Sequence, residues 1–210
     1  MRNIYWWMSV GLALTALTAV WVAHSEAIAE VFFANPGLVI GTIVVELALV
    51  VVMTLGLNKL SARTLMLLFL GYAVLNGLTF SVVFLVYTAG SIASTFLVTG
   101  GTFAAMAVYG SVTKRDLSSW RSFLLMGLIG LILASVVNFF LHSEMLYWGI
   151  TYAAVIVFVG LSAYDVQRLR RMAREGTLPV DKLYIFGALA LYLDFINLFL
   201  YLLRFLGNRR

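Results

Sequence analysis

Three carboxylic acids lie inside long apolar stretches of this sequence, where an ionised side chain is costly. Asp194 lies in the run LYLDFINLF (191–199), Glu46 lies in the middle of an earlier apolar run, and Asp165 comes at the end of another. A carboxylate at mid-bilayer costs about 2.5 to 3.5 kcal/mol on insertion scales. Each acid is therefore expected to face protein or a water-filled cavity, where it can hold a proton or a cation.

Polar residues around Asp194 are spaced for one face of a helix. The positions i, i+3, i+7 and i+10 of this stripe are Asp194, Asn197, Tyr201 and Arg204. At 3.6 residues per turn they share a face, and the other sides of the segment are apolar. We expect a central helix whose polar stripe looks into a bundle. The alternative is structural, with Asp194 protonated or paired with an arginine.

Asp165 stands where an apolar run becomes amphipathic. Residues 164–171 (YDVQRLRR) continue the helical pattern out of the membrane, and Gly176 and Pro179 are the expected stop signals. Asp165 is therefore expected near the cytoplasmic boundary. A weak surface salt bridge to Arg168 is the alternative to a functional role, and the bases that follow are expected to contact lipid headgroups.

The composition requires a membrane around these elements. Of 210 residues, 63% are hydrophobic and 11% are charged, which is more apolar surface than one soluble core of this size can hide. The chain is therefore expected to be an all-α integral membrane protein with a single domain over residues 1–210. Stretches of about twenty apolar residues can cross a bilayer, and seven are predicted: 4–23, 37–57, 65–87, 91–112, 122–141, 146–165 and 183–206.

Thiolate or imidazole metal sites and nucleic-acid binding are not expected. The sequence has no cysteine, and its two histidines, His24 and His142, lie in short connections. These residues offer no thiolate or imidazole cluster, so no resident cofactor is predicted. The net charge of +5 comes from bases in short loops, where they orient helices and contact anionic lipid rather than nucleic acid.

The basic residues predict the orientation of the spans. They gather before the first span and in the loops after the second, fourth and sixth, whereas the alternate loops hold none. The positive-inside rule places the N-terminus in the cytoplasm and, after seven crossings, the C-terminus outside. Arg209 and Arg210 then break the rule; either the other loops outweigh them, which we expect, or the last segment does not cross fully.

The first span resembles a signal peptide in its basic start and apolar run. It is longer than a typical signal core, and Trp6, Trp7 and Trp21 lie near its ends. That aromatic placement is typical of a retained span, so we expect it to stay in the bundle.

Small residues four apart are spaced for close helix contact. Examples are Gly100 with Ala104 and Gly149 with Ala153. Gly71 and Gly77 in the third span and Gly127 and Gly130 in the fifth indicate either bending or close contact, and the sequence does not separate the two.

Four segments together resemble the bacterial branch of the Bax inhibitor-1 family, also called the transmembrane Bax-inhibitor-motif family. They are residues 75–88 (LNGLTFSVVFLVYT), 109–116 (YGSVTKRD), 163–171 (AYDVQRLRR) and 188–199 (ALALYLDFINLF). The resemblance runs over nearly the whole chain. It implies a multi-pass protein of the bacterial inner membrane, with six helices around a central C-terminal one. It also implies a calcium leak gated by pH through two aspartates that share a proton, here Asp165 and Asp194.

The resemblance implies further residues of the pathway. Family members carry a basic latch near the inner end of the second helix, which pairs with the aspartate of the sixth. Here the latch would be Lys59, or Arg63 further on. Glu46 matches an acid of the second helix, and Arg204 matches a basic residue near the end of the last.

A proton-sharing pair of carboxyl groups explains how such a leak would work. Two carboxyls a few ångströms apart cannot both ionise cheaply, so they titrate as one unit. A shared proton holds the helices together, whereas two ionised groups repel or admit a cation. Calcium takes roughly six to eight oxygens, of which two aspartates supply only part even if Asn197 and water add others. Binding is therefore expected to be transient, as conduction requires.

Two other functions fit the same pattern. The first is a non-transporting regulator that docks a membrane-bound protease. Such a regulator transports no ions, so a measurement of calcium flux from purified protein distinguishes it from a leak. An intramembrane aspartyl protease also needs two aspartates, but those enzymes have glycines before the second one. Here bulky residues precede Asp194, and no triad, phosphate loop or zinc motif is present, so we expect no enzyme.

Overall fold

Backbone polar groups find no water inside a bilayer, so each long apolar run must satisfy its own hydrogen bonds as a helix. The computed structural model describes residues 1–210, apart from the side chain of Glu26. In this described part, seven helices are long and apolar enough to cross a membrane, as predicted. They are α1 (Arg2–His24), α3 (Pro36–Leu55), α4 (Ala62–Val86), α5 (Ala89–Val112), α6 (Trp120–Leu141), α7 (Glu144–Glu175) and α8 (Val180–Leu206).

Two shorter elements lie between the spans. The helix α2 (Glu26–Ala34) follows α1, and the 3-10 turn η1 (Leu117–Ser119) precedes α6. The sequence predicted no element between residues 23 and 37, so α2 was not foreseen. That connection has an apolar helical segment of its own, ended by Asn35 before the proline that starts α3.

The chain divides into two compact units. The first unit is Met1–Ala89 with Glu175–Tyr192 and Arg209–Arg210, and the second is Gly90–Arg174 with Leu193–Asn208. The helix α8 therefore belongs to the first unit up to Tyr192 and to the second from Leu193. The predicted ring of six helices around α8 stays a prediction.

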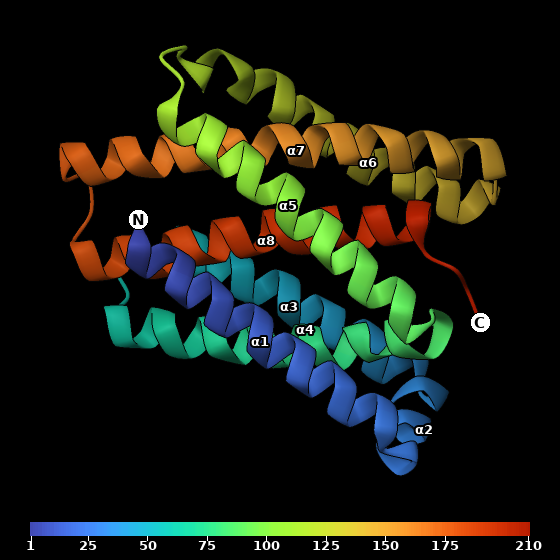
Figure 1. Ribbon diagram of the computed structural model, residues 1–210. Helices are drawn as coiled ribbons and strands as arrows, with labels where there is room; N and C mark the ends of the chain where they lie inside the picture. The colour runs from blue at the N-terminus through green and yellow to red at the C-terminus, as the bar shows by residue number, and fades with distance from the viewer. The chain divides into compact units, whose positions relative to one another are not determined.

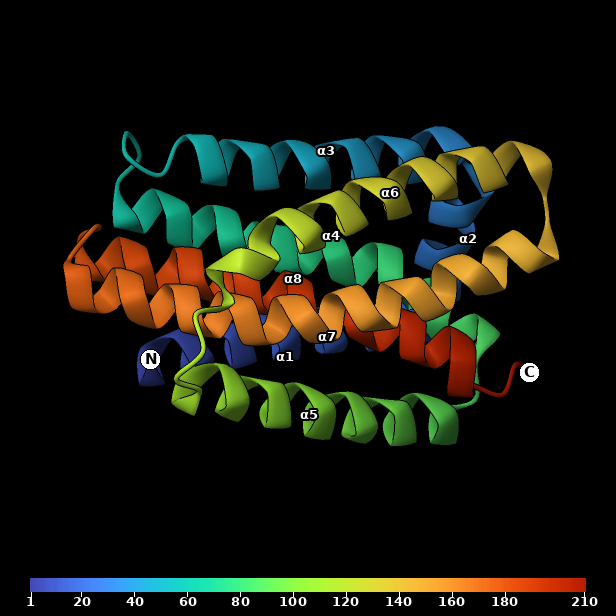
Figure 2. The ribbon, with the colours of Figure 1, turned by 90° about the horizontal axis from the view of Figure 1, so that it is seen from above.

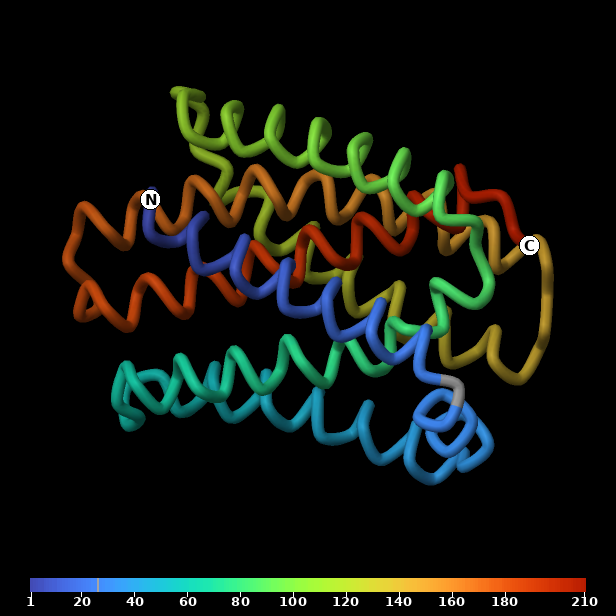
Figure 3. Tube along the Cα trace, turned by 60° about the horizontal axis from the view of Figure 1, so that its bottom comes forward, coloured from blue at the N-terminus to red at the C-terminus, as the bar shows by residue number. Residues whose placement is uncertain are grey.

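In the first unit, α4 packs between α1 and α3 (Figures 1 and 2). The Thr15 hydroxyl of α1 donates to the Ala73 carbonyl oxygen of α4 at 2.8 Å. A Cβ atom at Gly77 would lie 2.6 Å from the Thr15 carbonyl oxygen, so this glycine lets the two helices approach. The first span is thus an integral part of the bundle, and the chain passes from it through α2 into α3 (Figure 3).

The two termini lie at opposite ends of the first unit, where seven crossings would place them (Figure 1). Near the start of α8, the Lys182 ammonium donates to the Leu57 carbonyl oxygen after α3 at 3.0 Å. After α8, the Arg210 N–H donates to the Val86 carbonyl oxygen at the end of α4 at 2.9 Å. These contacts lie at opposite ends of the unit, which supports a full crossing by the 27 residues of α8.

In the second unit, α5 and α7 meet at Gly110. A Cβ atom there would collide with the backbone carbonyl of Ala163, and one at Gly127 of α6 would lie 2.9 Å from Val157 of α7. Of the two alternatives left open by the sequence, close packing therefore applies at Gly77 and Gly127, whereas an added Cβ at Gly71 or Gly130 meets no atom of the same unit within 4 Å. At Gly100 and Gly149, by contrast, no atom of the same unit lies within 4 Å of an added Cβ, so the contacts predicted there were wrong within the unit.

Candidate functional site

Asp194 is buried in α8 with one carboxyl oxygen unpaired. Its side chain is 5% exposed, and it is the one buried residue of a charged type in the described chain. Its Oδ2 atom has no hydrogen-bond partner among the described residues. An unpaired buried oxygen of this kind is costly unless a proton, a cation or water satisfies it. The placement away from lipid agrees with the sequence prediction.

Asp165 of α7 lies in the same unit and acts electrostatically on Asp194. Its side chain is 14% exposed, and its Oδ1 atom lies 3.8 Å from the Arg168 guanidinium, one helical turn further on. This is the weak pair at i+3 that the sequence analysis gave as an alternative. No hydrogen bond joins the Asp165 and Asp194 carboxyls within the described residues, so their interaction there acts through space.

The other residues of the predicted stripe on α8 become more exposed toward the C-terminal end of the helix. The Asn197 amide donates to the Leu193 carbonyl oxygen of its own helix at 2.8 Å. Arg204 is exposed, and its guanidinium lies 5.1 Å from the Tyr201 ring centre and 5.4 Å from that of Tyr147 in α7. Arg204 therefore joins α8 to α7 through aromatic rings.

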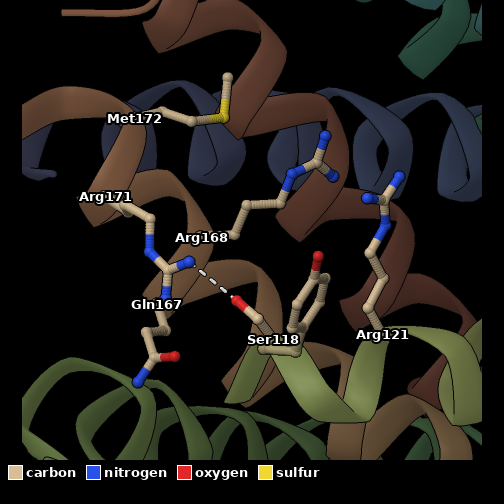
Figure 4. Close-up of a pocket in the computed structure, with 7 residues that line it drawn as sticks. Ser118, Arg121, Gln167, Arg168, Arg171 and Met172 are labelled. Atoms are coloured by element: carbon tan, nitrogen blue, oxygen red, sulfur yellow. Dashed lines mark hydrogen bonds between the residues drawn. The ribbon is translucent and has the colours of Figure 1, made fainter. Parts of the chain in front are cut away.

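The amphipathic end of α7 holds the loop between α5 and α6. The Gln167 side chain accepts from the Leu117 N–H and donates to the Arg115 carbonyl oxygen, both at 2.8 Å. Arg171 donates to Asp116 at 2.7 Å. It also donates to the Ser118 hydroxyl at 2.8 Å (Figure 4). The bases of this segment were expected to contact lipid headgroups, but Arg171 binds the loop instead. The helix ends at Glu175, before Gly176, as predicted.

The contacts of Asp116 predict how the stability of the fold depends on pH. The Ser118 backbone N–H and the Arg171 guanidinium lower the pKa of Asp116 from 3.8 to about 2. A group whose pKa is lowered by folding stabilises the fold above its ordinary value and loses that contribution as the pH falls through the folded value. We therefore expect the difference in Tm between Asp116→Asn and wild type to be constant between about pH 5 and pH 8 and to shrink below about pH 4. A difference that varies between pH 5 and pH 8 in detergent melts would contradict this.

Glu46 belongs to a separate polar cluster in the first unit. It accepts from the Thr79 hydroxyl at 3.0 Å and acts electrostatically on the hydroxyls of Tyr72 and Tyr192. The Tyr192 hydroxyl also shares a 2.7 Å hydrogen bond with Thr15. Sequence reasoning treated Tyr192 only as a bulky neighbour of Asp194. The polar residues Thr15 and Thr79 inside apolar spans were the signal that could have found this cluster.

A basic latch on Asp165 stays a prediction. The ion pair that the structure gives Asp165 is with Arg168. Lys59 is exposed beyond the end of α3, and it forms no ion pair within the described residues of its own unit. Sequence reasoning missed Lys182 in this region. Its ammonium binds two carbonyl oxygens after α3, those of Leu57 and Asn58.

Removing the Lys182 ammonium is expected to loosen the end of α3. A cation near the last carbonyls of a helix stabilises it by about 0.3 to 1 kcal/mol, so Lys182→Met should lower Tm by a few degrees. Lys59→Met, in the adjoining exposed loop, is the matched control. Equal losses of Tm in the two variants would show that Lys182 has no special contact there.

The acids do not form a closed metal site. No group of three or more histidine, cysteine, aspartate or glutamate side chains that could hold a metal lies together in the described residues. A pair of carboxyls can bind calcium only with help from carbonyls or water. A cation bound by Asp165 and Asp194 would therefore need further oxygen ligands.

Comparison with known proteins gives the family. A family model described as inhibitor of apoptosis-promoting Bax1 matches residues 1–210. The inner membrane protein YbhL of Escherichia coli is 54% identical over all of this chain and 92% of its own length. A protein of Borreliella burgdorferi is 42% identical over the whole chain and 92% of its own length. A membrane protein of Streptococcus pyogenes is 34% identical over 98% of the chain and 91% of its own length. The chain belongs to the Bax inhibitor family of multi-pass membrane proteins.

Proposed function

We propose that this protein is a pH-sensitive calcium leak of the bacterial inner membrane, gated by Asp165 and Asp194. The observation that carries the proposal is the buried Asp194 carboxyl, which has an unpaired oxygen and lies within electrostatic reach of Asp165. The name of the YbhL relative supports the inner membrane as the location. The seven apolar helices make the lipid bilayer its surroundings.

The gate works through one proton shared by two acids. When the pair holds one proton, the carboxylic acid donates a hydrogen bond to the remaining carboxylate, and the passage between α7 and α8 is closed. When the pH rises and both ionise, they repel, and a calcium ion can enter between them. The two carboxyls bind the ion weakly enough to release it, because they supply only part of its shell. Flux is therefore expected to rise with pH.

The pathway uses other residues of the chain. Glu46 is a second acidic position for the ion, held by the Thr79 hydroxyl. Arg168 is the cation that competes with calcium for Asp165. No covalent step is needed in this cycle, so the proposal assigns the protein no enzymatic reaction.

Flux from the purified protein tests the proposal. The full chain is reconstituted in liposomes that contain a calcium indicator, and calcium entry is followed at about pH 6, pH 7 and pH 8 with protein-free liposomes as the control. We expect entry to rise severalfold from pH 6 to pH 8. Entry no faster than in protein-free liposomes at every pH would contradict the leak and favour a regulator that acts by docking a membrane protein.

A further inference from the structure

A cavity of about 260 Å³ opens in the second unit beside the amphipathic end of α7. Its wall carries three guanidinium groups, those of Arg121, Arg168 and Arg171 (Figure 4). Ser118 and Tyr164 add hydroxyls, and Met172 adds an apolar side. The cavity lies at the end of the unit that the basic loops assign to the cytoplasm.

The three arginines of this cavity differ in how firmly they are held. Arg171 is tied to Asp116 by an ion pair of 2.7 Å. Arg168 meets Asp165 at 3.8 Å, which is long for a charge-assisted contact, and its side chain is 44% exposed. Arg121 forms no ion pair or hydrogen bond with another described residue. Arg121 therefore brings to the cavity a positive charge that no carboxylate of the described residues pairs with.

Arg121 also lies in an unusual place for a cation. It is the second residue of α6, in the first turn, where the helix dipole disfavours positive charge. At the N-terminal end of α6, the side chain of the N-cap residue, Ser119, forms no capping hydrogen bond. In Figure 4 the guanidinium groups of Arg121 and Arg168 extend in the same direction from two different segments. An anion between them would offset both charges.

The donors of the cavity are those that recognise phosphate. A guanidinium offers a planar fork that binds two phosphate oxygens, and hydroxyls complete the coordination. The Tyr164 ring is 9% exposed, and its hydroxyl has no hydrogen bond to another described residue, so it is a free donor. With Arg121 and Arg168, the cavity thus has three groups able to contact one phosphate.

From these contacts we propose that the cavity between η1, the start of α6 and the end of α7 binds a phosphate group. The group comes from the headgroup of an anionic lipid or from free phosphate, since both present the same oxygens. Binding draws Arg168 toward the phosphate and away from Asp165, because one guanidinium cannot serve both anions equally. Asp165 and the phosphate ligand therefore compete for Arg168. This site does not depend on the proposed calcium leak.

Binding to the purified full chain in uncharged detergent tests the site. The probes are short-chain phosphatidylglycerol and inorganic phosphate, each titrated separately, with short-chain phosphatidylcholine as a zwitterionic comparison. Saturable binding of either anion that is weakened about tenfold in Arg121→Gln supports the proposal. The anion that binds identifies the source of the phosphate. Arg121→Lys should lie between, since it keeps the charge and loses the fork.

Two further variants separate this site from a general basic surface. Lys114→Gln removes an exposed charge from the same loop outside the cavity, and it should change binding less than twofold. Asp165→Asn removes the carboxylate that faces Arg168 and should tighten binding a few-fold, which a diffuse electrostatic attraction would not single out. Tm values equal to wild type show that each variant is folded. Binding of neither anion, or equal weakening by Arg121→Gln and Lys114→Gln, would overturn the proposal.

Discussion

Replacing Asp194 with asparagine is expected to abolish the rise of calcium flux with pH. The amide has nearly the shape of a protonated carboxyl, so it keeps the closed arrangement at every pH and supplies no charge to a cation. We expect flux at about pH 8 to fall at least tenfold, because losing one of two ionised ligands of a hard cation costs more than the ~1.4 kcal/mol that corresponds to tenfold. The measurement is calcium entry into liposomes with the purified variant.

Asp181→Asn is the matched control for that experiment. Asp181 lies in the first turn of the same helix, α8, but is exposed. Its loss changes the charge of the chain equally and should leave the dependence of flux on pH intact. A folded Asp194→Asn protein, judged by its Tm, that still conducts more as the pH rises would contradict the gate. Equal losses in both variants would indicate a general effect of charge.

Adding one methyl group at Gly110 is expected to destabilise the second unit. The new Cβ in Gly110→Ala would meet the backbone carbonyl of Ala163, which cannot turn aside like a flexible side chain. The helices α5 and α7 must move apart, and overpacking of this kind typically costs about 1 to 3 kcal/mol. Because Ala163 is two residues before Asp165, we also expect the pH response of the flux to shift. Thermal melting in detergent measures the loss of stability as a fall in Tm.

Gly100→Ala in the same helix is the control for Gly110. An added Cβ there meets no atom of its unit within 4 Å, and alanine favours a helix over glycine by about 0.5 to 1 kcal/mol. Its Tm should therefore equal or exceed that of wild type. A loss of Tm at Gly100 as large as that at Gly110 would show that the collision with Ala163 is not the cause.

The spans were predictable because the bilayer sets their length. Any run of about twenty apolar residues must become a helix to satisfy its backbone, and the end of α7 followed from Gly176 and Pro179. The helix α2 was missed because its nine residues are too short for that rule. Helix contacts were only partly predictable. Gly77 and Gly100 have similar small-residue contexts, but only the face that each turns to a neighbour decides which one packs.

The acids of the candidate site were visible in the sequence because a carboxyl in an apolar run is conspicuous, and Asp194 is buried as that reasoning requires. Their partners were less visible. Arg168 was foreseeable, since it is one turn from Asp165. The pairing of Arg171 with Asp116 spans 55 positions, and no local spacing predicts it. Lys182 likewise binds carbonyl oxygens more than a hundred positions away, which only the fold brings close.

The central claim is that Asp165 and Asp194 act as one titrating unit, and a double-mutant comparison tests it most directly. Calcium flux into liposomes is measured against pH for wild type, Asp165→Asn, Asp194→Asn and the double variant. Residues that act as a unit are not additive, so we predict that each single variant loses the dependence on pH and that the double variant loses no more. Separate pH responses in the two single variants, with effects that add in the double variant, would contradict the pair.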